Sequence, residues 1–317
     1  MAMPPLPPPP RRLLIVDRDR DANGAYLQDR LPNLEIRTAE RTDLVAADLE
    51  WADAYLGFRP PPHLELDALA WVHCTGAGVD AYLFRRRFPA GTLLTRNDEP
   101  FGRQIGEWCQ ARALAVTQQL LPLAAAQARG EWAQRHLQPL HGSTVLIIGT
   151  GAVGQGIAAA FAAVGCVVHG VSATGRAVAP FGNVFPVSDL AERIAAAQVV
   201  ILALPLTEAT WHLVGPAALG AGRGAFLMNV GRGALLDEAS LLPALDAGHL
   251  SGVALDVFET EPLPPDSPLW ADPRVIVSPH MAGITTVAGA GESFLQVYHA
   301  LARGESPGLA VDPARGY

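Results

Sequence analysis

The stretch TVLIIGTGAVGQGIAAAFAAVG, residues 144–165, decides the fold. It opens with an aliphatic run that predicts a buried strand, passes through a glycine-rich turn and continues as an alanine-rich segment typical of a helix. A Gly-x-Gly-x-x-Gly turn between a strand and a helix is typical of dinucleotide-binding α/β units. In such a unit Gly149 permits the tight turn, Gly151 lets the backbone approach a pyrophosphate, and Gly154 lets helix and strand pack closely.

The first residues of the following helix complete this predicted phosphate site. Backbone N–H groups at a helix N-terminus attract anions, so we expect Ala152 and Val153 to contribute to pyrophosphate binding. The alternative is a glycine-bearing turn between strand and helix that binds no ligand.

The choice of cofactor depends on the end of the next strand. An NAD site usually has a carboxylate there for the ribose 2′-hydroxyl, but no acid occurs between Gly154 and Asp189. Instead the strand leads into Ser172, Thr174 and Arg176, and a guanidinium pairs well with a 2′-phosphate. The sequence therefore predicts NADP(H) in preference to NAD(H), unless Arg176 is only a solvent-exposed loop residue.

Apolar runs alternate with helical segments on both sides of this stretch, the pattern of α/β folds with parallel sheets. Before it lie predicted strands at 13–17, 34–39, 52–58, 69–74 and 91–96. A long helical stretch follows over 104–127, broken by Pro122. From the glycine turn onward, strands are predicted at 144–149, 166–171, 199–204, 225–230, 252–257 and 274–279. The chain turns helical again after Gly283.

These elements predict two Rossmann-like or flavodoxin-like α/β domains. We expect a cofactor domain over 98–283, inserted into an outer domain made of 1–97 and 284–317. A cleft between two such domains is where a ligand is expected.

Composition excludes several classes of protein. Half of the 317 residues are hydrophobic and 17% are charged, which indicates a compact globular chain. No apolar run is long enough to span a membrane. All 23 basic residues are arginines, so lysine-based chemistry is excluded, and the net charge of −8 argues against nucleic-acid binding.

The cysteines indicate the compartment. Cys74, Cys109 and Cys166 are odd in number, widely spaced and without a CxxC pair. This pattern favours a reducing cytoplasm and argues against a disulfide framework or a zinc site, so we expect no metal.

Three further segments lie where predicted strands end, at the edge of a parallel sheet that binds ligands. They are NVGRG (229–233), DVFETEP (256–262) and SPHMAG (278–283). Singly each is ordinary, since an arginine after a strand is often a surface residue and a lone histidine is often structural. What distinguishes the three segments is their order and their spacing after the glycine turn.

With these segments the chain resembles the D-isomer-specific 2-hydroxyacid dehydrogenases, and among them the glyoxylate/hydroxypyruvate reductases. The resemblance covers nearly the whole chain, through TGAGVD (75–80), the glycine turn, LPLTEAT (204–210), NVGRGALLDEASL (229–241), LDVFETEPLP (255–264), SPHMAG and VDPARGY (311–317). It implies an outer substrate-binding domain, a small 2-oxo or 2-hydroxy acid as substrate and a homodimer.

The resemblance also implies a catalytic set of Arg232, Glu261 and His280. Arg232 would bind the substrate carboxylate and polarise its carbonyl, and His280 would exchange a proton with the carbonyl oxygen. Glu261 would orient the imidazole and favour its charged form. Glu259 is a rival for this last role, but Glu261 precedes Pro262, as the family's Glu-Pro pattern requires.

Other positions are carried over from the same resemblance. Backbone amides of Ala77 and Gly78 would bind the substrate carboxylate, and the alternative is that TGAGVD is a plain glycine turn after a strand. Residues expected to line the dinucleotide are Pro205, Thr210, Val230, Asp256, which would meet the nicotinamide amide, and Gly283.

Two alternatives remain beside the reductase. Family relatives act as dinucleotide-sensing corepressors and keep the same three residues, so a binding module is one alternative. The other is a dehydrogenase for a bulkier 2-oxo acid, because the sequence does not reveal which substrate side chain is accepted.

Overall fold

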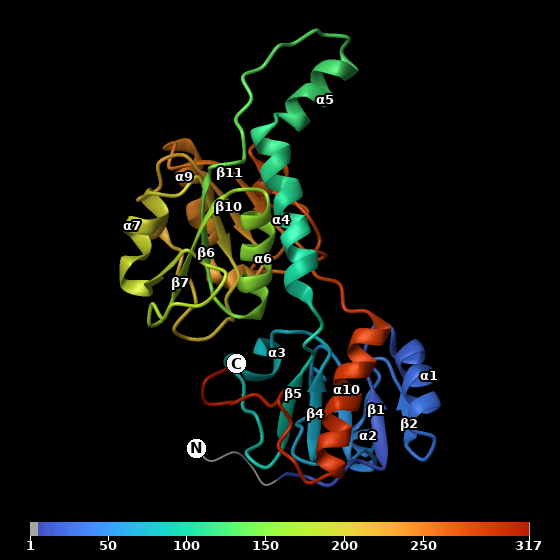
Figure 1. The fold of residues 1–317 in the computed structure, drawn as a ribbon. Coiled ribbons are helices and arrows are strands. Elements are labelled where there is room, and N and C mark those ends of the chain that lie inside the picture. The colour runs from blue at the N-terminus through green and yellow to red at the C-terminus, as the bar shows by residue number, and fades with distance from the viewer. Residues whose placement is uncertain (1–5, 317) are drawn as a thin grey trace. The chain divides into compact units, whose positions relative to one another are not determined.

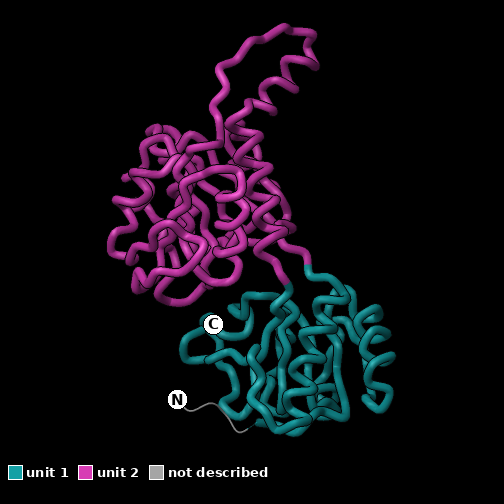
Figure 2. The backbone as a smooth tube through the Cα atoms, in the orientation of Figure 1, with its two compact units in different colours: residues 1–99, 285–317 teal, residues 100–284 magenta. Residues whose placement is uncertain are grey.

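The computed structural model describes residues 6–316, which form two compact units. Unit 1 comprises 1–99 and 285–317, and unit 2 comprises 100–284 (Figure 2). Unit 2 is therefore inserted between the two pieces of unit 1.

Unit 1 is built on a five-stranded parallel sheet with the order β2-β1-β3-β4-β5 (Figure 1). Its strands are β1 (Arg12–Ile15), β2 (Glu35–Thr38), β3 (Ala54–Leu56), β4 (Trp71–Cys74) and β5 (Leu93–Arg96). Its helices are α1 (Arg20–Arg30), α2 (Ala46–Trp51), α3 (Asp80–Leu83) and α10 (Val287–Ala302). This strand order is that of flavodoxin-like folds.

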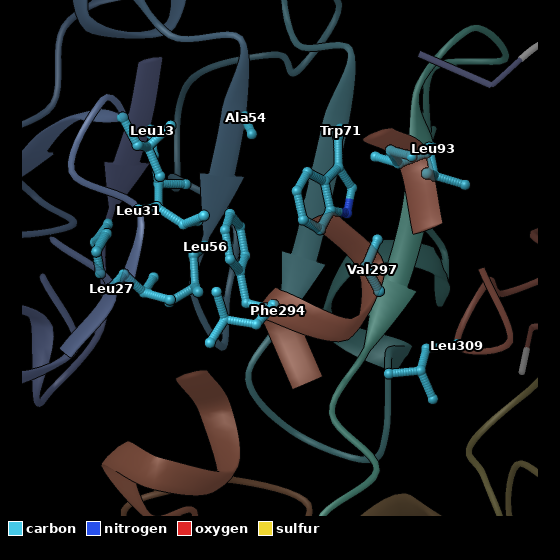
Figure 3. Close-up of a cluster of buried hydrophobic side chains, with 14 residues drawn as sticks. Leu13, Leu27, Leu31, Ala54, Leu56, Trp71, Leu93, Phe294, Val297 and Leu309 are labelled. Carbon is cyan, nitrogen blue, oxygen red and sulfur yellow. The ribbon is translucent and has the colours of Figure 1, made fainter. Parts of the chain in front are cut away.

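Both faces of this sheet are covered, because successive strand residues point to opposite sides. On one face Leu13, Ile15 and Trp71 pack with the helices α1 and α10, and the ring of Trp71 stacks on Phe294 at 4.4 Å between centroids (Figure 3). On the other face Leu14 and its neighbours pack with α2 and α3. The strands consequently read as nearly continuous apolar runs.

Unit 2 contains a seven-stranded parallel sheet with the order β12-β11-β10-β9-β6-β7-β8. Its strands are β6 (Thr144–Ile148), β7 (Val167–Ser172), β8 (Asn183–Pro186), β9 (Val199–Leu202), β10 (Ala225–Asn229), β11 (Leu250–Leu255) and β12 (Val275–Val277). Its α-helices are α4 (Phe101–Thr117), α5 (Leu120–Ala128), α6 (Ala152–Ala163), α7 (Leu190–Ala195), α8 (Pro216–Leu219) and α9 (Leu241–Asp246). Short 3-10 turns are η1 (Val187–Asp189), η2 (Gly233–Leu235), η3 (Glu238–Ser240) and η4 (Pro268–Trp270).

The strand order of unit 2 reverses between β6 and β9, which lie side by side. From β6 the sheet grows through β7 and β8 to one edge, and from β9 through β10, β11 and β12 to the other. In open α/β sheets the ligand binds at the carboxyl ends of the strands at such a switch point. The glycine turn that follows β6 lies at this point.

Helices α4 and α6 pack unusually closely because glycines lie at their crossing. A Cβ added to Gly156 would lie 2.6 Å from the Cα of Gly102, and one added to Gly106 would lie 2.9 Å from the Cβ of Ala160. Small residues let two helix backbones approach, so this pair depends on Gly102 and Gly156 having no side chains.

The long helical stretch is interrupted at a different residue from the one predicted. We expected a break at Pro122, but α4 ends at Thr117 and Gln119 has a left-handed φ of 55°. Pro122 lies in the first turn of α5, where a backbone N–H has no partner within the helix, so proline costs little there.

The prediction of two α/β domains with parallel sheets, one inserted into the other, is confirmed. Strand β8 was not predicted, since it is short and half-exposed and ends in a proline. Among the described residues, no helix is both long and apolar enough to cross a membrane.

Candidate active site

The glycine turn after β6 has the geometry expected of a phosphate loop. Gly149 has φ +110°, and a Cβ there would lie 2.4 Å from the carbonyl oxygen of Ala203. A Cβ on Gly154 would lie 2.0 Å from the carbonyl oxygen of Gly149. Both positions therefore require glycine because any side chain would collide with the protein's own backbone. Gly151 differs, because a Cβ there would meet nothing within 4 Å.

That open space suits a dinucleotide. Gly151 caps the twelve-residue helix α6, whose first residues are Ala152 and Val153. The N-terminus of such a helix presents unpaired N–H groups and a positive dipole end. The uncrowded face at Gly151 would let a pyrophosphate reach these groups, so the residues present fit the cofactor.

The loop after β7 holds the three residues predicted to choose the cofactor. The Ser172 hydroxyl accepts a hydrogen bond of 3.1 Å from the N–H of Gly175, which leaves its own proton free to be donated. Thr174 and Arg176 are exposed. Arg176 makes no hydrogen bond or ion pair with the described residues, so its guanidinium is available to an anion.

The loop after β9 is held together by Thr210. Its hydroxyl donates to the carbonyl oxygen of Pro205 at 2.7 Å and accepts from the N–H of Thr207 at 2.8 Å. Sequence reasoning placed Pro205 and Thr210 beside the dinucleotide. The geometry shows that the Thr210 hydroxyl is already engaged in shaping this loop.

Arg232 follows β10 and is fixed at its backbone by a buried neighbour. The Asn229 side chain donates to the carbonyl oxygen of Arg232 at 2.9 Å and accepts from the N–H of Gly231 at 3.2 Å. The Arg232 guanidinium donates to the carbonyl oxygen of Gly231 at 2.8 Å. Val230, which lies between Asn229 and Gly231 in the sequence, is buried.

His280 and Glu261 meet after β12 and β11. The imidazole Nδ1 lies 2.9 Å from Glu261 Oε2, and Glu261 Oε1 accepts from the N–H of Phe258 at 3.2 Å. Their side chains are 31% and 22% exposed, so the pair is reachable by a ligand. Glu259, the rival, lies 3.0 Å from His212 instead.

Asp256 holds the loop that carries His280. Its Oδ1 accepts from the Ser278 hydroxyl at 2.5 Å and the Met281 N–H at 3.0 Å, and its Oδ2 accepts from the Ala282 N–H at 2.8 Å. Its carbonyl oxygen accepts from the N–H of His280 at 2.7 Å. A carboxylate can accept about four hydrogen bonds, and these three contacts leave Oδ2 with the capacity for one more.

The segment 278–283 thus has a fixed path. His280 itself has a left-handed φ of 50°, which a non-glycine residue adopts only when its surroundings hold it there. Gly283 packs on α4, where an added Cβ would lie 3.1 Å from Ile105. A close fit with α4 is therefore the structural reason for glycine at this position.

Ala77 and Gly78 belong to unit 1, in the loop after β4. Their N–H groups donate to no acceptor in the described part of the chain, whereas their carbonyl oxygens accept from Arg96 and Cys74. The loop is anchored by the Thr75 hydroxyl, which donates to Asp17 at 2.6 Å. Two unengaged amides in an anchored loop suit an anionic group.

Sequence reasoning missed the residues that position the others. Asn229 and Ser278 are buried polar side chains that orient the loops of Arg232 and His280. Each lies in a segment already singled out, at the end of β10 or just after β12, and a polar residue closing an apolar strand was the available signal. His212 carries no signal that sequence spacing reveals.

A dinucleotide loop at a topological switch point, with a histidine–glutamate pair after neighbouring strands, defines a nicotinamide-dependent oxidoreductase. Residues 111–282 match the family model of the D-isomer specific 2-hydroxyacid dehydrogenase NAD binding domain. The chain belongs to the D-isomer specific 2-hydroxyacid dehydrogenase family and is an NAD(P)-dependent enzyme.

Relatives agree along nearly the whole chain. A glyoxylate/hydroxypyruvate reductase A of Serratia proteamaculans is 32% identical over 302 residues, which is 92% of this chain and 95% of the relative. A D-isomer specific 2-hydroxyacid dehydrogenase of Xanthobacter autotrophicus, solved with NADPH and MES, is 31% identical. Its TM-score is 0.88, and the match covers 97% of this chain and all of that one. An NADPH-dependent glyoxylate/hydroxypyruvate reductase of Sinorhizobium meliloti, solved with NADP and sulfate, is 28% identical, with a TM-score of 0.84 and coverage of 96% and 99%.

Proposed function

We propose that the protein is an NADPH-preferring reductase of small 2-oxo acids, of the glyoxylate and hydroxypyruvate type, which forms D-2-hydroxy acids. The observation that carries the proposal is the 2.9 Å contact between His280 and Glu261. It lies in a dinucleotide-binding unit whose relatives include glyoxylate/hydroxypyruvate reductases.

The bound nicotinamide supplies the hydride, and the chain's own residues handle the proton and the charge. Glu261 accepts from Nδ1–H of His280 and so orients the imidazole, and Nε2 is the nitrogen that would exchange the proton with the substrate. His280 then donates a proton to the carbonyl oxygen during reduction and recovers it in the reverse direction. Arg232 binds the substrate carboxylate and polarises the carbonyl, and no metal is required.

Unit 1 supplies the substrate-binding domain in this proposal, and unit 2 supplies the cofactor domain. The unengaged amides of Ala77 and Gly78 bind the substrate carboxylate. The remaining acceptor site of Asp256 receives the nicotinamide amide, while Ser172, Thr174 and Arg176 bind the 2′-phosphate. Pro205, Thr210, Val230 and Gly283 line the dinucleotide.

The proposal is tested by following NADPH and NADH oxidation with glyoxylate, hydroxypyruvate and phenylpyruvate. We expect turnover of the two small acids, faster with NADPH, and little turnover of phenylpyruvate. Efficient reduction of phenylpyruvate would instead assign a bulkier substrate. Absence of turnover with every acid and both cofactors would leave a dinucleotide-binding module.

His280→Asn tests the proton donor without disturbing the backbone, because asparagine tolerates a left-handed φ. We expect a loss of about 10²–10⁴-fold in kcat, the usual contribution of general acid catalysis, with NADPH affinity unchanged. Steady-state kinetics and fluorescence titration with NADPH measure the two quantities. A kcat within a few-fold of the wild type would remove His280 from this role.

We also propose that the protein acts in a reducing cytoplasm as a homodimer. The three cysteines are buried and form no disulfide, as expected of a protein that does not rely on disulfides. Helix α5 and the segment after it project from the body of unit 2 (Figure 1). They expose Leu120, Leu121 and Trp132, the last at 94%. In the proposed dimer a second copy of the chain buries these apolar side chains.

A further inference from the structure

A second histidine–carboxylate cluster lies on the same edge of the sheet as the pair of His280 and Glu261. His212, Asp237 and Glu259 each offer one ligand atom, and these atoms all lie within 4.8 Å of one another. They come from three segments that follow β9, β10 and β11. The cluster is therefore assembled by the fold from residues far apart in the sequence.

Backbone hydrogen bonds hold the three segments together. The N–H of His212 donates to the carbonyl oxygen of Ala234 at 2.8 Å, and the N–H of Asp237 donates to that of Val214 at 3.2 Å. Glu259 is tied in as well, since its Oε1 accepts from the N–H of Glu238 at 3.1 Å. The three side chains are thus presented by a fixed frame, which lowers the cost of ordering them around a ligand.

The His212 ring shows an unusual feature. Its Nε2 atom is covered by protein, yet it has no hydrogen-bond partner among the described residues. Glu259 Oε1 lies only 3.0 Å away, but it is off the direction of the N–H bond. A short contact without alignment is unlike a histidine–carboxylate hydrogen bond. Ligand atoms around a shared ion meet in this way, because each directs its lone pair at the ion.

We propose that His212, Asp237 and Glu259 form a binding site for one divalent transition-metal ion, with Zn²⁺ as its preferred occupant. An imidazole nitrogen with two carboxylate oxygens suits Zn²⁺ better than Mg²⁺ or Ca²⁺, which prefer oxygen ligands alone. Bonds of about 2.1 Å would place the ligand atoms roughly 3–3.5 Å apart, within reach of small side-chain rotations. A water molecule completes the coordination.

The site departs from the sequence-based expectation of no metal, and it does not depend on the proposed reaction. Ser240 donates to Asp237 Oδ2 at 2.6 Å, which orients the carboxylate and leaves Oδ1 for the ion. Trp211 stacks on the His212 ring at 4.1 Å between centroids and is 42% exposed. Its fluorescence is therefore a built-in reporter of what happens at His212.

The test is calorimetric titration of ZnCl₂ into the full-length chain after chelator treatment, with tryptophan fluorescence recorded in parallel. We expect one ion per chain and at least a tenfold weaker affinity in His212→Asn and in Glu259→Gln. Asparagine suits the φ of 49° at His212, and glutamine can still accept from the Glu238 N–H, so both variants should keep the loops in place. Circular dichroism checks that they are folded.

Two matched variants separate this site from others. His280→Asn removes the other histidine of left-handed backbone conformation, and His136→Asn removes an exposed histidine. Both should bind Zn²⁺ as the wild type does. The proposal is overturned by no binding to the wild type, by unchanged affinity in either His212→Asn or Glu259→Gln, or by loss of binding in His280→Asn.

Discussion

Two glutamates, two residues apart, lie beside two different histidines. Glu261 holds His280 through a well-formed hydrogen bond, while Glu259 faces His212 at a similar distance but out of line. Strand β11 ends before both, so the path of the following loop decides which carboxylate meets which ring. Neighbouring residues of the same type thus acquire different chemistry from geometry alone.

Arg176 is the residue on which the cofactor prediction depends. Arg176→Ala should raise the KM for NADPH about 10–100-fold and leave that for NADH nearly unchanged, because charge-assisted hydrogen bonds contribute roughly 1.5–3 kcal/mol each. Steady-state kinetics with both cofactors measure the difference. Arg223→Ala, at another exposed arginine of unit 2, is the control. Equal effects on NADPH and NADH would contradict 2′-phosphate binding.

His73 gives unit 1 a sensitivity to acid. It is fully buried between Thr95 and Ser293, and burial lowers its pKa from 6.5 to about 3. Above pH 6.5 neither the folded nor the unfolded chain protonates this ring. As the pH falls below 6.5, His73 becomes protonated in the unfolded chain but stays neutral in the folded one. The free energy of unfolding therefore decreases with pH down to about pH 3.

The expected loss from His73 alone is about 1.4 kcal/mol per pH unit in the free energy of unfolding. Urea unfolding between pH 6.5 and 4.5 should show a steeper decline for the wild type than for His73→Gln, which keeps a polar side chain but does not titrate. If the free energy of unfolding declined equally with pH in the two proteins, His73 would not be the cause of the acid sensitivity.

At the scale of elements, the glycine that caps α6 and a glycine within that helix have different roles. A side chain at Gly156 would collide with the backbone of α4 at Gly102, whereas one at Gly151 would point into open space. Gly156→Val should therefore lower the free energy of unfolding by about 2–3 kcal/mol through overpacking. Gly151→Val should leave it within about 0.5 kcal/mol and weaken dinucleotide binding at least tenfold.

Chemical denaturation and NADPH titration of both variants measure these effects. Each variant serves as the control for the other, since the substitution is the same, once at the N-cap of α6 and once within that helix. Unimpaired NADPH binding by a stable Gly151→Val variant would show that no pyrophosphate approaches this turn.

The sequence predicts these elements well where their pattern is periodic and less well where packing decides. Strands such as β6 and β9 read clearly because buried parallel strands are apolar throughout. The break at Gln119 could not be predicted, because a left-handed φ at glutamine has no local sequence signature. The proline at Pro122 instead led us to predict the break there. In the site, the glycines and the residues at strand ends can be predicted from the sequence. The cluster around His212 cannot, because it forms only where three loops meet in the folded chain.

At the scale of the whole molecule, we expect the projecting segment of unit 2 to form the interface of the proposed dimer. Leu120→Glu with Leu121→Glu should convert the proposed dimer to a monomer, because two charges would be buried without partners at the interface. Size-exclusion chromatography with light scattering measures the mass. Val164→Glu, at an exposed apolar residue elsewhere in unit 2, should remain dimeric. A wild-type protein that is already monomeric would contradict the proposal.

The insertion of unit 2 into unit 1 has a consequence for synthesis on the ribosome. Helix α10 gives Phe294 and Val297 to the core of unit 1, but it is translated only after all of unit 2. At about 5–20 residues per second, β1 to β5 wait roughly 10–40 s for the helix that covers one face of their sheet. The domain that emerges first is completed last. During that interval its uncovered strands are the part of the nascent chain that most needs a chaperone.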